Sequence, residues 1–414
     1  MHARAPAAAK TAPRRHARPV VVVAAAPAAA ATTAAAAPGQ DDFASFERFV
    51  VASQEQILRE AEAIDGSGRT FLRDRWERPG AAAAAGGATS GGGYGVTAVL
   101  EGGDLLEKAA ANITVVRGVL SPQRAAAMSS RGRGSVDARG GQRYGAAALS
   151  LVFHPRHPRV PTLRADVRLF QVFADEGGVE EEEDEGQRRQ QQQQRQQQQQ
   201  PSPPLSWYGG GCDLTPALLF DEDARDFHAH WRGVCDAHHD ALYAELKPWC
   251  DRYFYVTARK EHRGVGGIFF DDLERPTAAA AATGGGDDNA ASEGAPRSMA
   301  AARAGEYDPA SFARDVLANV LPSWRGIAER RRREPLVEAE REWQLVRRSR
   351  FLEFNLLDDR GVRFGLADGN GRVESIMVSA PPLAAWRYSV VPPEGSREAA
   401  TLALLSGPPK EWAA

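Results

Sequence analysis

One stretch decides the fold of this chain: Trp207-Tyr208-Gly209-Gly210-Gly211-Cys212-Asp213-Leu214-Thr215-Pro216. Its three consecutive glycines allow backbone conformations and close approaches that a Cβ atom would prevent. Asp213 follows them almost directly, and two aromatic residues precede them. A flexible loop is the simple alternative in a chain with 40 glycines. The combination instead indicates an ordered segment that a flat or bulky ligand with N–H donors can lie against.

Two later blocks repeat the pairing of glycines with acids. They are residues 263–273 (RGVGGIFFDDL) and 352–361 (LEFNLLDDRG), the second followed by 364–366 (FGL). Together with 71–79 (FLRDRWERP) and 101–118, these motifs resemble the oxygen-dependent coproporphyrinogen III oxidase family from about Phe43 to Trp412. The resemblance implies one large antiparallel sheet with helices on both sides.

Low-complexity segments interrupt this pattern. Residues 80–95 are rich in Gly and Ala, 175–204 hold an acidic run and a glutamine tract, and 277–305 are of the same kind. Such segments cannot bury enough apolar surface to order themselves. We therefore expect a single domain over 41–414, with about 300 ordered residues and three insertions.

Composition excludes several classes of protein. The net charge of −3 gives no reason to expect a nucleic-acid partner. The three cysteines, Cys212, Cys235 and Cys250, are too few and too scattered for a disulfide framework, which favours a reducing compartment. Their spacing matches no structural zinc site. No run of 18 apolar residues is present, so we expect no transmembrane helix.

Residues 1–40 differ from the rest of the chain. They contain arginines, Lys10 and many alanines, but no acid before Asp41. This composition is typical of an organelle transit peptide. The run Pro19–Ala26 is a competing secretory signal, which fits the cysteine usage poorly. We expect a plastid stroma, with the mitochondrion as the alternative.

Hydrophobic periodicity predicts an α+β fold with a mainly antiparallel sheet. The pattern predicts helices at 42–64, 221–240, from Asp308-Pro309 onward, and at 336–348. It predicts strands at 146–153, 162–173, 252–259, 351–357, 363–367 and 373–379, with Asn370-Gly371 as a turn between the last two.

The segment 162–170 (TLRADVRLF) alternates between polar and apolar residues. In a strand, Arg164, Asp166 and Arg168 share one face. An ordinary half-exposed strand with a charge pair is the alternative. Asp213 is the first candidate for a catalytic group, because a carboxylate can accept hydrogen bonds from pyrrole N–H groups. Its alternative role is to cap a turn.

The resemblance implies the remaining site residues. Catalytic roles fall on Asp213, Asp359 and Arg360. The residues implied to bind the tetracarboxylate substrate are Ser150, Asp166, Arg168, Gly209, Gly210, Gly211, Arg259, Arg263, Asn370, Gly371 and Arg372. Guanidinium groups suit this ligand because they pair bidentately with carboxylates. For each arginine alone, a surface salt bridge is the alternative.

The resemblance also implies the reaction, which is the oxidative decarboxylation of coproporphyrinogen III. Two propionates become vinyl groups, molecular oxygen is the co-substrate, and CO2 and H2O2 are released. No flavin, haem or other cofactor is implied, and the chain has no dinucleotide-binding fingerprint. The resemblance further implies a homodimer.

The chain departs from the family pattern at three positions. Arg164 stands where the family has its general-acid histidine, Ala258 replaces a second histidine, and Asp166 replaces an asparagine. His154 and His228 match family histidines. With two of four histidines lost, we expect no metal site, and a metal enzyme is the weakest hypothesis. A weakly active or inactive paralogue that binds porphyrinogen or pairs with an active subunit is the stronger alternative.

Overall fold

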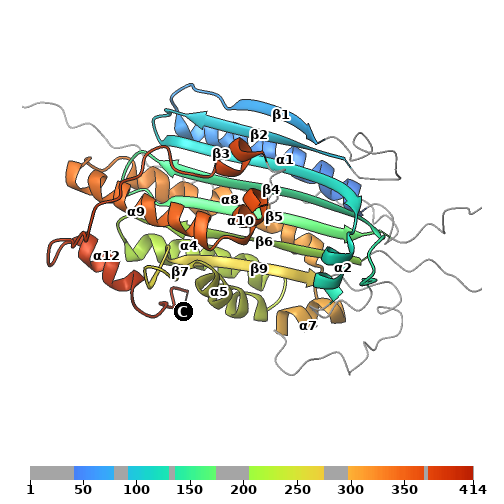
Figure 1. The fold of residues 1–414 in the computed structure, drawn as a ribbon. Coiled ribbons are helices and arrows are strands. Elements are labelled where there is room, and N and C mark those ends of the chain that lie inside the picture. Colours follow the sequence, from blue (N-terminus) through green and yellow to red (C-terminus); the bar gives the residue numbers. More distant parts are fainter. Residues whose placement is uncertain are drawn as a thin grey trace, which may run out of the picture. The chain divides into compact units, whose positions relative to one another are not determined.

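An antiparallel sheet of seven strands forms the centre of the fold (Figure 1). The strands lie in the order β1-β2-β3-β4-β5-β6-β9, and every neighbouring pair is antiparallel. Their bounds are Leu72–Arg78, Gly93–Glu101, Leu106–Val119, Arg143–Pro155, Thr162–Val172, Leu205–Thr215 and Gly266–Glu274. The predicted α+β class and its antiparallel sheet are confirmed.

This computed structural model describes residues 42–78, 92–129, 136–173, 205–274, 297–367 and 372–413. All of them belong to one unit, Gly39–Ala414. The expected transit peptide, most of the three insertions and the Asn370-Gly371 turn lie outside the described residues. Within the predicted insertions, β2 begins at Gly93 and helix α7 occupies Arg297–Ala304.

One face of the sheet carries the main apolar core. The apolar side chains of β5, such as Leu163 and Val167, pack there against Phe46 of α1 and Trp324 of α8. The helices that contribute to this core are α1 (Asp42–Asp65), α4 (Asp221–Asp236), α5 (Ala241–Tyr253), α7 and α8 (Pro309–Arg331). The predicted start of α8 is confirmed, since the Asp308 side chain accepts hydrogen bonds from the backbone N–H groups of Ala310 and Ser311.

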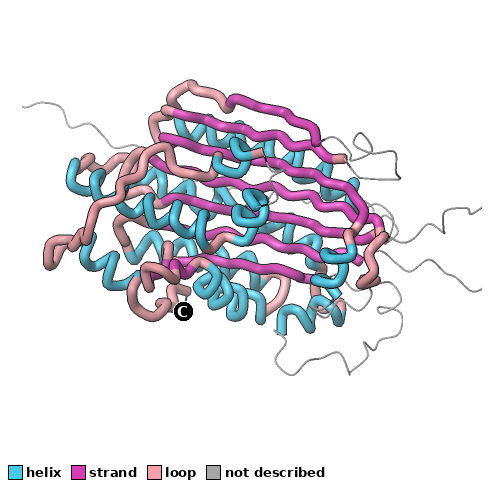
Figure 2. Tube along the Cα trace, viewed as in Figure 1, coloured by secondary structure: helices cyan, strands magenta, loops and turns pink. Residues whose placement is uncertain are grey.

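Helices also pack on the opposite face. There Phe351 of α9 (Glu338–Leu357) contacts Ala110 of β3 and Val152 of β4. Later in the chain come α10 (Arg360–Ala367), α11 (Val373–Met377) and α12 (Arg397–Leu405), of which α12 contributes Leu404 to the main core cluster. The short hairpin β7 (Tyr255–Val256) and β8 (Glu261–His262) and helix α2 (Pro122–Ser129) complete the described elements, which Figure 2 colours by type. None of the described helices is long and apolar enough to cross a membrane.

The strands predicted between residues 351 and 379 were wrong, although the helices predicted from Asp308 onward and at 336–348 are present as α8 and α9. Residues 351–357 continue helix α9, and the strands expected at 363–367 and 373–379 are the helices α10 and α11. Most of 252–259 is likewise not a strand, because α5 extends to Tyr253 and β7 has two residues. Short apolar runs of this length fit a buried helix as well as a strand, so packing against the sheet decided between them.

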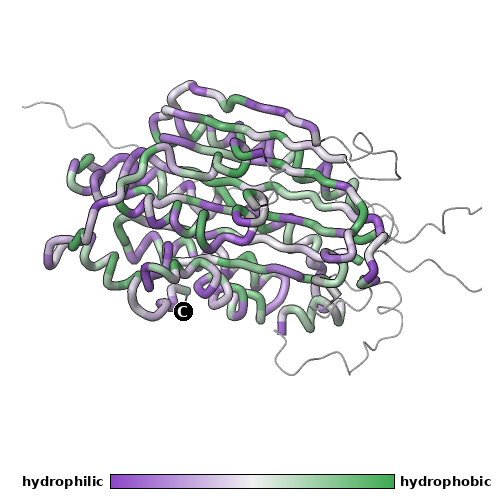
Figure 3. The backbone as a smooth tube through the Cα atoms, in the orientation of Figure 1, coloured by the Kyte–Doolittle hydropathy of each residue, from purple (hydrophilic) through white to green (hydrophobic). Residues whose placement is uncertain are grey.

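The edge strand β1 differs from the inner strands. Its sequence LRDRWER is drawn mostly in the hydrophilic colour in Figure 3. Charged side chains are typical of edge strands, because they discourage uncontrolled pairing with other chains. By contrast, every residue of β6 after Leu205 is buried.

The glycine run lies within β6, between β5 and β9. A Cβ atom on Gly210 would lie 2.5 Å from the carbonyl oxygen of Asp166, and one on Gly211 would lie 2.3 Å from that of Ile268. A Cβ atom on Gly209 would lie 2.6 Å from Nε of Arg168. The glycines therefore allow three strands and one guanidinium to pack closely, and the protein itself covers this backbone.

Gly210→Ala tests this close packing. The added methyl group meets backbone atoms of β5, which cannot move without loss of ladder hydrogen bonds. We expect the free energy of unfolding to fall by about 1–3 kcal/mol, measured by urea denaturation. Gly233→Ala on α4 is the control, since nothing lies within 4 Å of the position that a Cβ atom would take there. It should leave stability unchanged or raise it, and an equal loss in both variants would contradict the explanation.

Candidate active site

A row of residues crosses the whole sheet on the face opposite the main core. The strand registers place side by side Asp74, Thr97, Asn112, Ser150, Asp166, Gly211 and Phe269. Ser150 lies in β4, the middle strand, yet it is exposed to solvent. The helices on this face therefore leave the centre of the sheet open, and we take this opening as the candidate site.

Charged side chains of β5 line the opening. Arg164, Asp166 and Arg168 share this face, as predicted, while the alternate residues pack in the main core. Nη1 of Arg164 lies 2.7 Å from Oδ1 of Asp166, and Nη1 of Arg168 donates a hydrogen bond to the other oxygen of the same carboxylate. Nη2 of Arg168 lies 3.0 Å from Oδ1 of Asp271 on β9. Asp166 thus holds both guanidinium groups of its strand.

Asp213 forms a buried ion pair next to the charged side chains of β5. It lies opposite Arg164 in the register, and both Asp213 and Arg263 are 2% exposed. Nη2 of Arg263 donates a 2.5 Å hydrogen bond to Oδ2 of Asp213, whereas Oδ1 of Asp213 has no hydrogen-bond partner among the described residues. Nη1 of Arg164 lies 3.9 Å from that oxygen. The pair thus leaves one buried carboxylate oxygen without a hydrogen-bond partner among the described residues.

Aromatic rings hold Arg263 in place. Its guanidinium carbon lies 4.0 Å from the ring centre of Phe254, 4.6 Å from that of Phe351 and 4.8 Å from that of Phe354. Desolvated contacts of a cation with ring faces are favourable. The three rings therefore surround the guanidinium group and keep it oriented towards Asp213.

Arg164 and Arg168 on β5 remain charged. Burial lowers the pKa of Arg164, but Asp166 and Asp213 nearby raise it more, so the net pKa shift is upward. The pKa of Arg168 is raised in the same way by Asp166 and Asp271 against the effect of burial. Neither side chain can donate a proton near neutral pH.

The turn between α9 and α10 lies over the β9 side of the opening. Asp359 accepts a 2.8 Å hydrogen bond from the backbone N–H of Val362, which caps α10, and a 3.4 Å hydrogen bond from the hydroxyl of Tyr253. The guanidinium of Arg360 lies over the Tyr253 ring, 5.0 Å from its centre, and Nη2 of Arg360 lies 3.7 Å from Oδ2 of Asp271. Asp359 and Arg360 are thus brought to the site.

Two other predicted arginines lie at its margins. Arg372 forms an ion pair with Asp74, at the β1 end of the row. The hydroxyl oxygens of Ser375 on α11 and of Thr97 in the same row lie 2.9 Å apart. Arg259 lies in the turn between β7 and β8 and forms a bidentate pair with Glu353 of α9. For Arg259 the structure shows the salt bridge that was the alternative interpretation.

The two family histidines are buried structural groups. His154 is fully buried, and one ring nitrogen lies 2.9 Å from the carbonyl oxygen of Ser379. His228 lies on α4, on the core side of the sheet, and its ring nitrogens contact the hydroxyl of Tyr243 and the carbonyl oxygen of Val265. Burial lowers the pKa of each to about 3. Within the described ranges, no three His, Cys, Asp or Glu side chains cluster as metal ligands.

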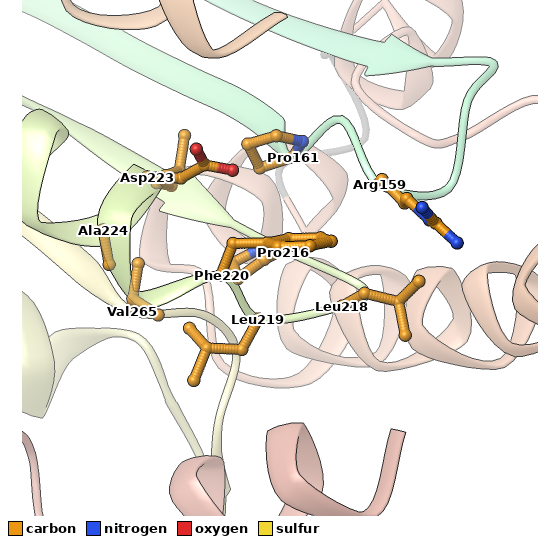
Figure 4. Close-up of a pocket in the computed structure, with 10 residues that line it drawn as sticks. Arg159, Pro161, Pro216, Leu218, Leu219, Phe220, Asp223, Ala224 and Val265 are labelled. Carbon is orange, nitrogen blue, oxygen red and sulfur yellow. The ribbon is translucent and has the colours of Figure 1, made fainter. Parts of the chain in front are cut away.

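The cavity in Figure 4 is a separate feature on the core side of the sheet. Its lining is mostly apolar and includes Pro161, Pro216 and Phe220. Its volume of about 10 Å³ holds no more than about one water molecule. It is too small for an organic ligand.

Comparison with known proteins shows the family of this chain. The family described as coproporphyrinogen III oxidase matches residues 45–412. The chain belongs to the coproporphyrinogen III oxidase family. Coproporphyrinogen-III oxidase 1, chloroplastic, from Arabidopsis thaliana is 36% identical over 372 residues, which are 89% of this chain and 79% of that protein. The mitochondrial oxygen-dependent coproporphyrinogen-III oxidase of Rattus norvegicus is 35% identical over 366 residues, 88% of this chain and 68% of the rat protein.

The sequence analysis did not single out three residues of the candidate site in this family member. Tyr253 and Phe254 fell in a segment predicted to be a strand, and Asp271 was noted only as an acid after a glycine run. Tyr253 stacks on Phe269 with 4.1 Å between ring centres. The acid that ends the glycine-rich segment 263–273 was the available signal for Asp271, because the same pairing had identified Asp213.

The buried histidines predict a pH dependence of stability. Folded His228 stays neutral down to about pH 3, whereas the unfolded chain protonates it near the ordinary pKa of 6.5. Between these values the unfolded state holds the extra proton, so the free energy of unfolding falls as pH falls. Urea denaturation at pH 6, 5 and 4 should show a slope for His228→Gln that is shallower by up to about 1.4 kcal/mol per pH unit. The same pH dependence of the free energy of unfolding in the wild type and in His228→Gln would contradict this assignment.

Proposed function

We propose that this protein is an oxygen-dependent coproporphyrinogen III oxidase. It converts two propionate groups of coproporphyrinogen III to vinyl groups, and each step consumes one O2 and releases CO2 and H2O2. Membership of the family supports this proposal. The observation that carries it is the buried Asp213, whose Oδ1 has no hydrogen-bond partner among the described residues. Asp213 lies next to Arg164, at the opening that the charged side chains of β5 line.

The distribution of arginines suits a wide ligand with several carboxylates. Arg168 and Arg360 lie near the β9 side of the opening, and Arg372 lies at Asp74 on β1. Asp74 and Asp166 are four strand spacings apart, which corresponds to about 19 Å. We propose that propionate groups bind these guanidinium groups at the two margins, with Ser150 beneath the ligand between them.

Asp213 then has a direct role towards the ring. Its Oδ1 accepts a hydrogen bond from a pyrrole N–H group, and the carboxylate stabilises positive charge that develops on the macrocycle. The deprotonated, electron-rich pyrrole reduces O2 to a peroxide. That peroxide removes a proton from the propionate β-carbon and leaves as H2O2. The carboxylate leaves as CO2, one of the two released electron pairs forms the vinyl double bond, and the other returns to the oxidised pyrrole.

Arg164 shapes how this chain performs the step. A guanidinium at this position cannot relay protons near neutral pH, so proton transfer is assigned to the substrate, the peroxide and solvent. Its positive charge is balanced by Asp166 and Asp213. We propose that Arg164 and Asp166 act as a compensated pair that keeps the floor of the site ordered.

We further propose a homodimer in an organelle. The outer edge of β1 is the proposed surface for a second copy, and its charged side chains limit pairing there to a specific partner. Sedimentation velocity would detect a mass of twice 44.6 kDa. The relatives from Arabidopsis thaliana and Rattus norvegicus are named chloroplastic and mitochondrial, respectively. The composition of residues 1–40 favours a plastid, which imaging of a fluorescent fusion would test.

Asp213→Asn tests the proposed function. The substitution keeps the shape of the side chain but removes the charge that faces the pyrrole groups. We expect kcat for coproporphyrinogen III under air to fall by at least about a hundredfold. The assay follows porphyrin fluorescence after oxidation of the product.

Asp223→Asn is the matched control. Asp223 is also a buried carboxylate paired with an arginine, Arg331, but it lies on α4 in the opposite layer. It should lose stability and keep activity. Wild-type protein that binds coproporphyrin III without turnover would refute the oxidase in favour of an inactive paralogue, and Arg164→His would then show whether a histidine at this position restores turnover.

A further inference from the structure

Three carboxylates of the site each face two arginines, and Asp271 is more exposed than the other two, Asp166 and Asp213. It lies on β9, and its two carboxylate oxygens face two different arginines, Arg168 at 3.0 Å and Arg360 at 3.7 Å. These arginines come from distant elements, β5 and the start of α10. A single carboxylate of the protein therefore lies between two guanidinium groups at the opening.

This cluster of Asp271, Arg168 and Arg360 is accessible, unlike the deeper pairs. The side chains of Arg360, Arg168 and Asp271 are 56%, 35% and 23% exposed, whereas those of Asp213 and Arg263 are 2% and 1% exposed. A ligand carboxylate can reach the two outer guanidinium groups without breaking a buried pair. At these guanidinium groups the ligand carboxylate competes with the carboxylate of Asp271, which already binds both of them.

Asp271 is not needed to hold Arg168 in place. The guanidinium of Arg168 also pairs with the buried Asp166, and its Nε lies against Gly209 in the space that a Cβ atom would occupy. The guanidinium of Arg360 has a second contact with the ring of Tyr253. Both arginines thus keep an anchor when Asp271 is displaced.

We infer that Asp271 is a positioning residue that occupies the place of a substrate carboxylate in the free enzyme. It binds Arg168 and Arg360 until the ligand arrives, and a carboxylate of the ligand then replaces it. This inference rests on the proposed function, in which these arginines bind propionate groups. In the free enzyme Arg168 and Arg360 share the single negative charge of Asp271. When a substrate propionate arrives, it takes the place of Asp271 or shares the arginines with it.

The exchange has a consequence for product release. Substrate and product both carry carboxylates, and each leaves the site only if the guanidinium groups find another partner or water. Asp271 offers that partner within the site, so it weakens binding of both anionic ligands and speeds their departure. Its removal should tighten binding and slow release, an effect opposite to that of losing an ordinary structural contact.

The test measures binding of coproporphyrin III, a tetracarboxylate that cannot undergo the reaction, by quenching of its fluorescence. For Asp271→Asn we expect the Kd at low salt to fall by about three- to fivefold, the range that a partly exposed charge pair supports. The difference should shrink as salt rises, because salt screens exposed charges. Asp271→Glu should bind as the wild type does.

A matched control removes a similar pair elsewhere. Glu55→Gln breaks the ion pair with Arg73 on β1, whose side chains are 42% and 40% exposed. It should leave the Kd unchanged. Thermal unfolding confirms that each variant is folded at the assay temperature, and Asp271→Ser is tested in the same way if the asparagine variant is unfolded.

An unchanged or increased Kd in folded Asp271→Asn would overturn the inference. Turnover adds an independent measurement, since the variant should show a lower KM, a lower kcat and stronger inhibition by product. A uniform loss of kcat with unchanged KM would also contradict it. The proposed function is judged separately by turnover of the wild type, while the binding experiment needs no turnover and tests Asp271 alone.

Discussion

The ion pair between Asp213 and Arg263 is the contact on which the site depends. Both groups are almost completely buried, and a charge in that environment is costly unless a partner of opposite sign lies beside it. Removing one member of such a pair typically destabilises a protein by about 3–5 kcal/mol. The pair is therefore a constraint on the whole region, and the rings of Phe254, Phe351 and Phe354 that enclose Arg263 are part of it.

The same constraint explains the alternation of charges over the floor of the site. Arg164, Asp166 and Arg168 follow one another on one face of β5, and Asp271 continues the alternation on β9. Each charge has an opposite neighbour, so the floor is neutral as a whole although its parts are strongly charged. Only the members at the margin are exposed, which separates the groups that support the fold from those that can exchange partners with a ligand.

The glycine run has a different role from the one first expected. The sequence pattern suggested bare backbone for a ligand to lie against, but the neighbouring strands and the Arg168 side chain cover it. The physical reason is that Gly209 leaves room for a guanidinium, while Gly210 and Gly211 bring β5, β6 and β9 together. The glycines shape the site indirectly, by bringing Asp213 and Asp271 within reach of the β5 arginines.

The sequence by itself determined the family, the antiparallel sheet class and the common face of Arg164, Asp166 and Arg168, because long motifs and two-residue periodicity are local properties of a chain. It also indicated Asp213 through its neighbours. Only the tertiary structure decided that residues 351–357, 360–367 and 373–377 are helical, that Arg259 pairs with Glu353 and that Tyr253 and Asp271 join the site. Those outcomes depend on contacts between residues far apart in the chain, whose energies no local pattern records.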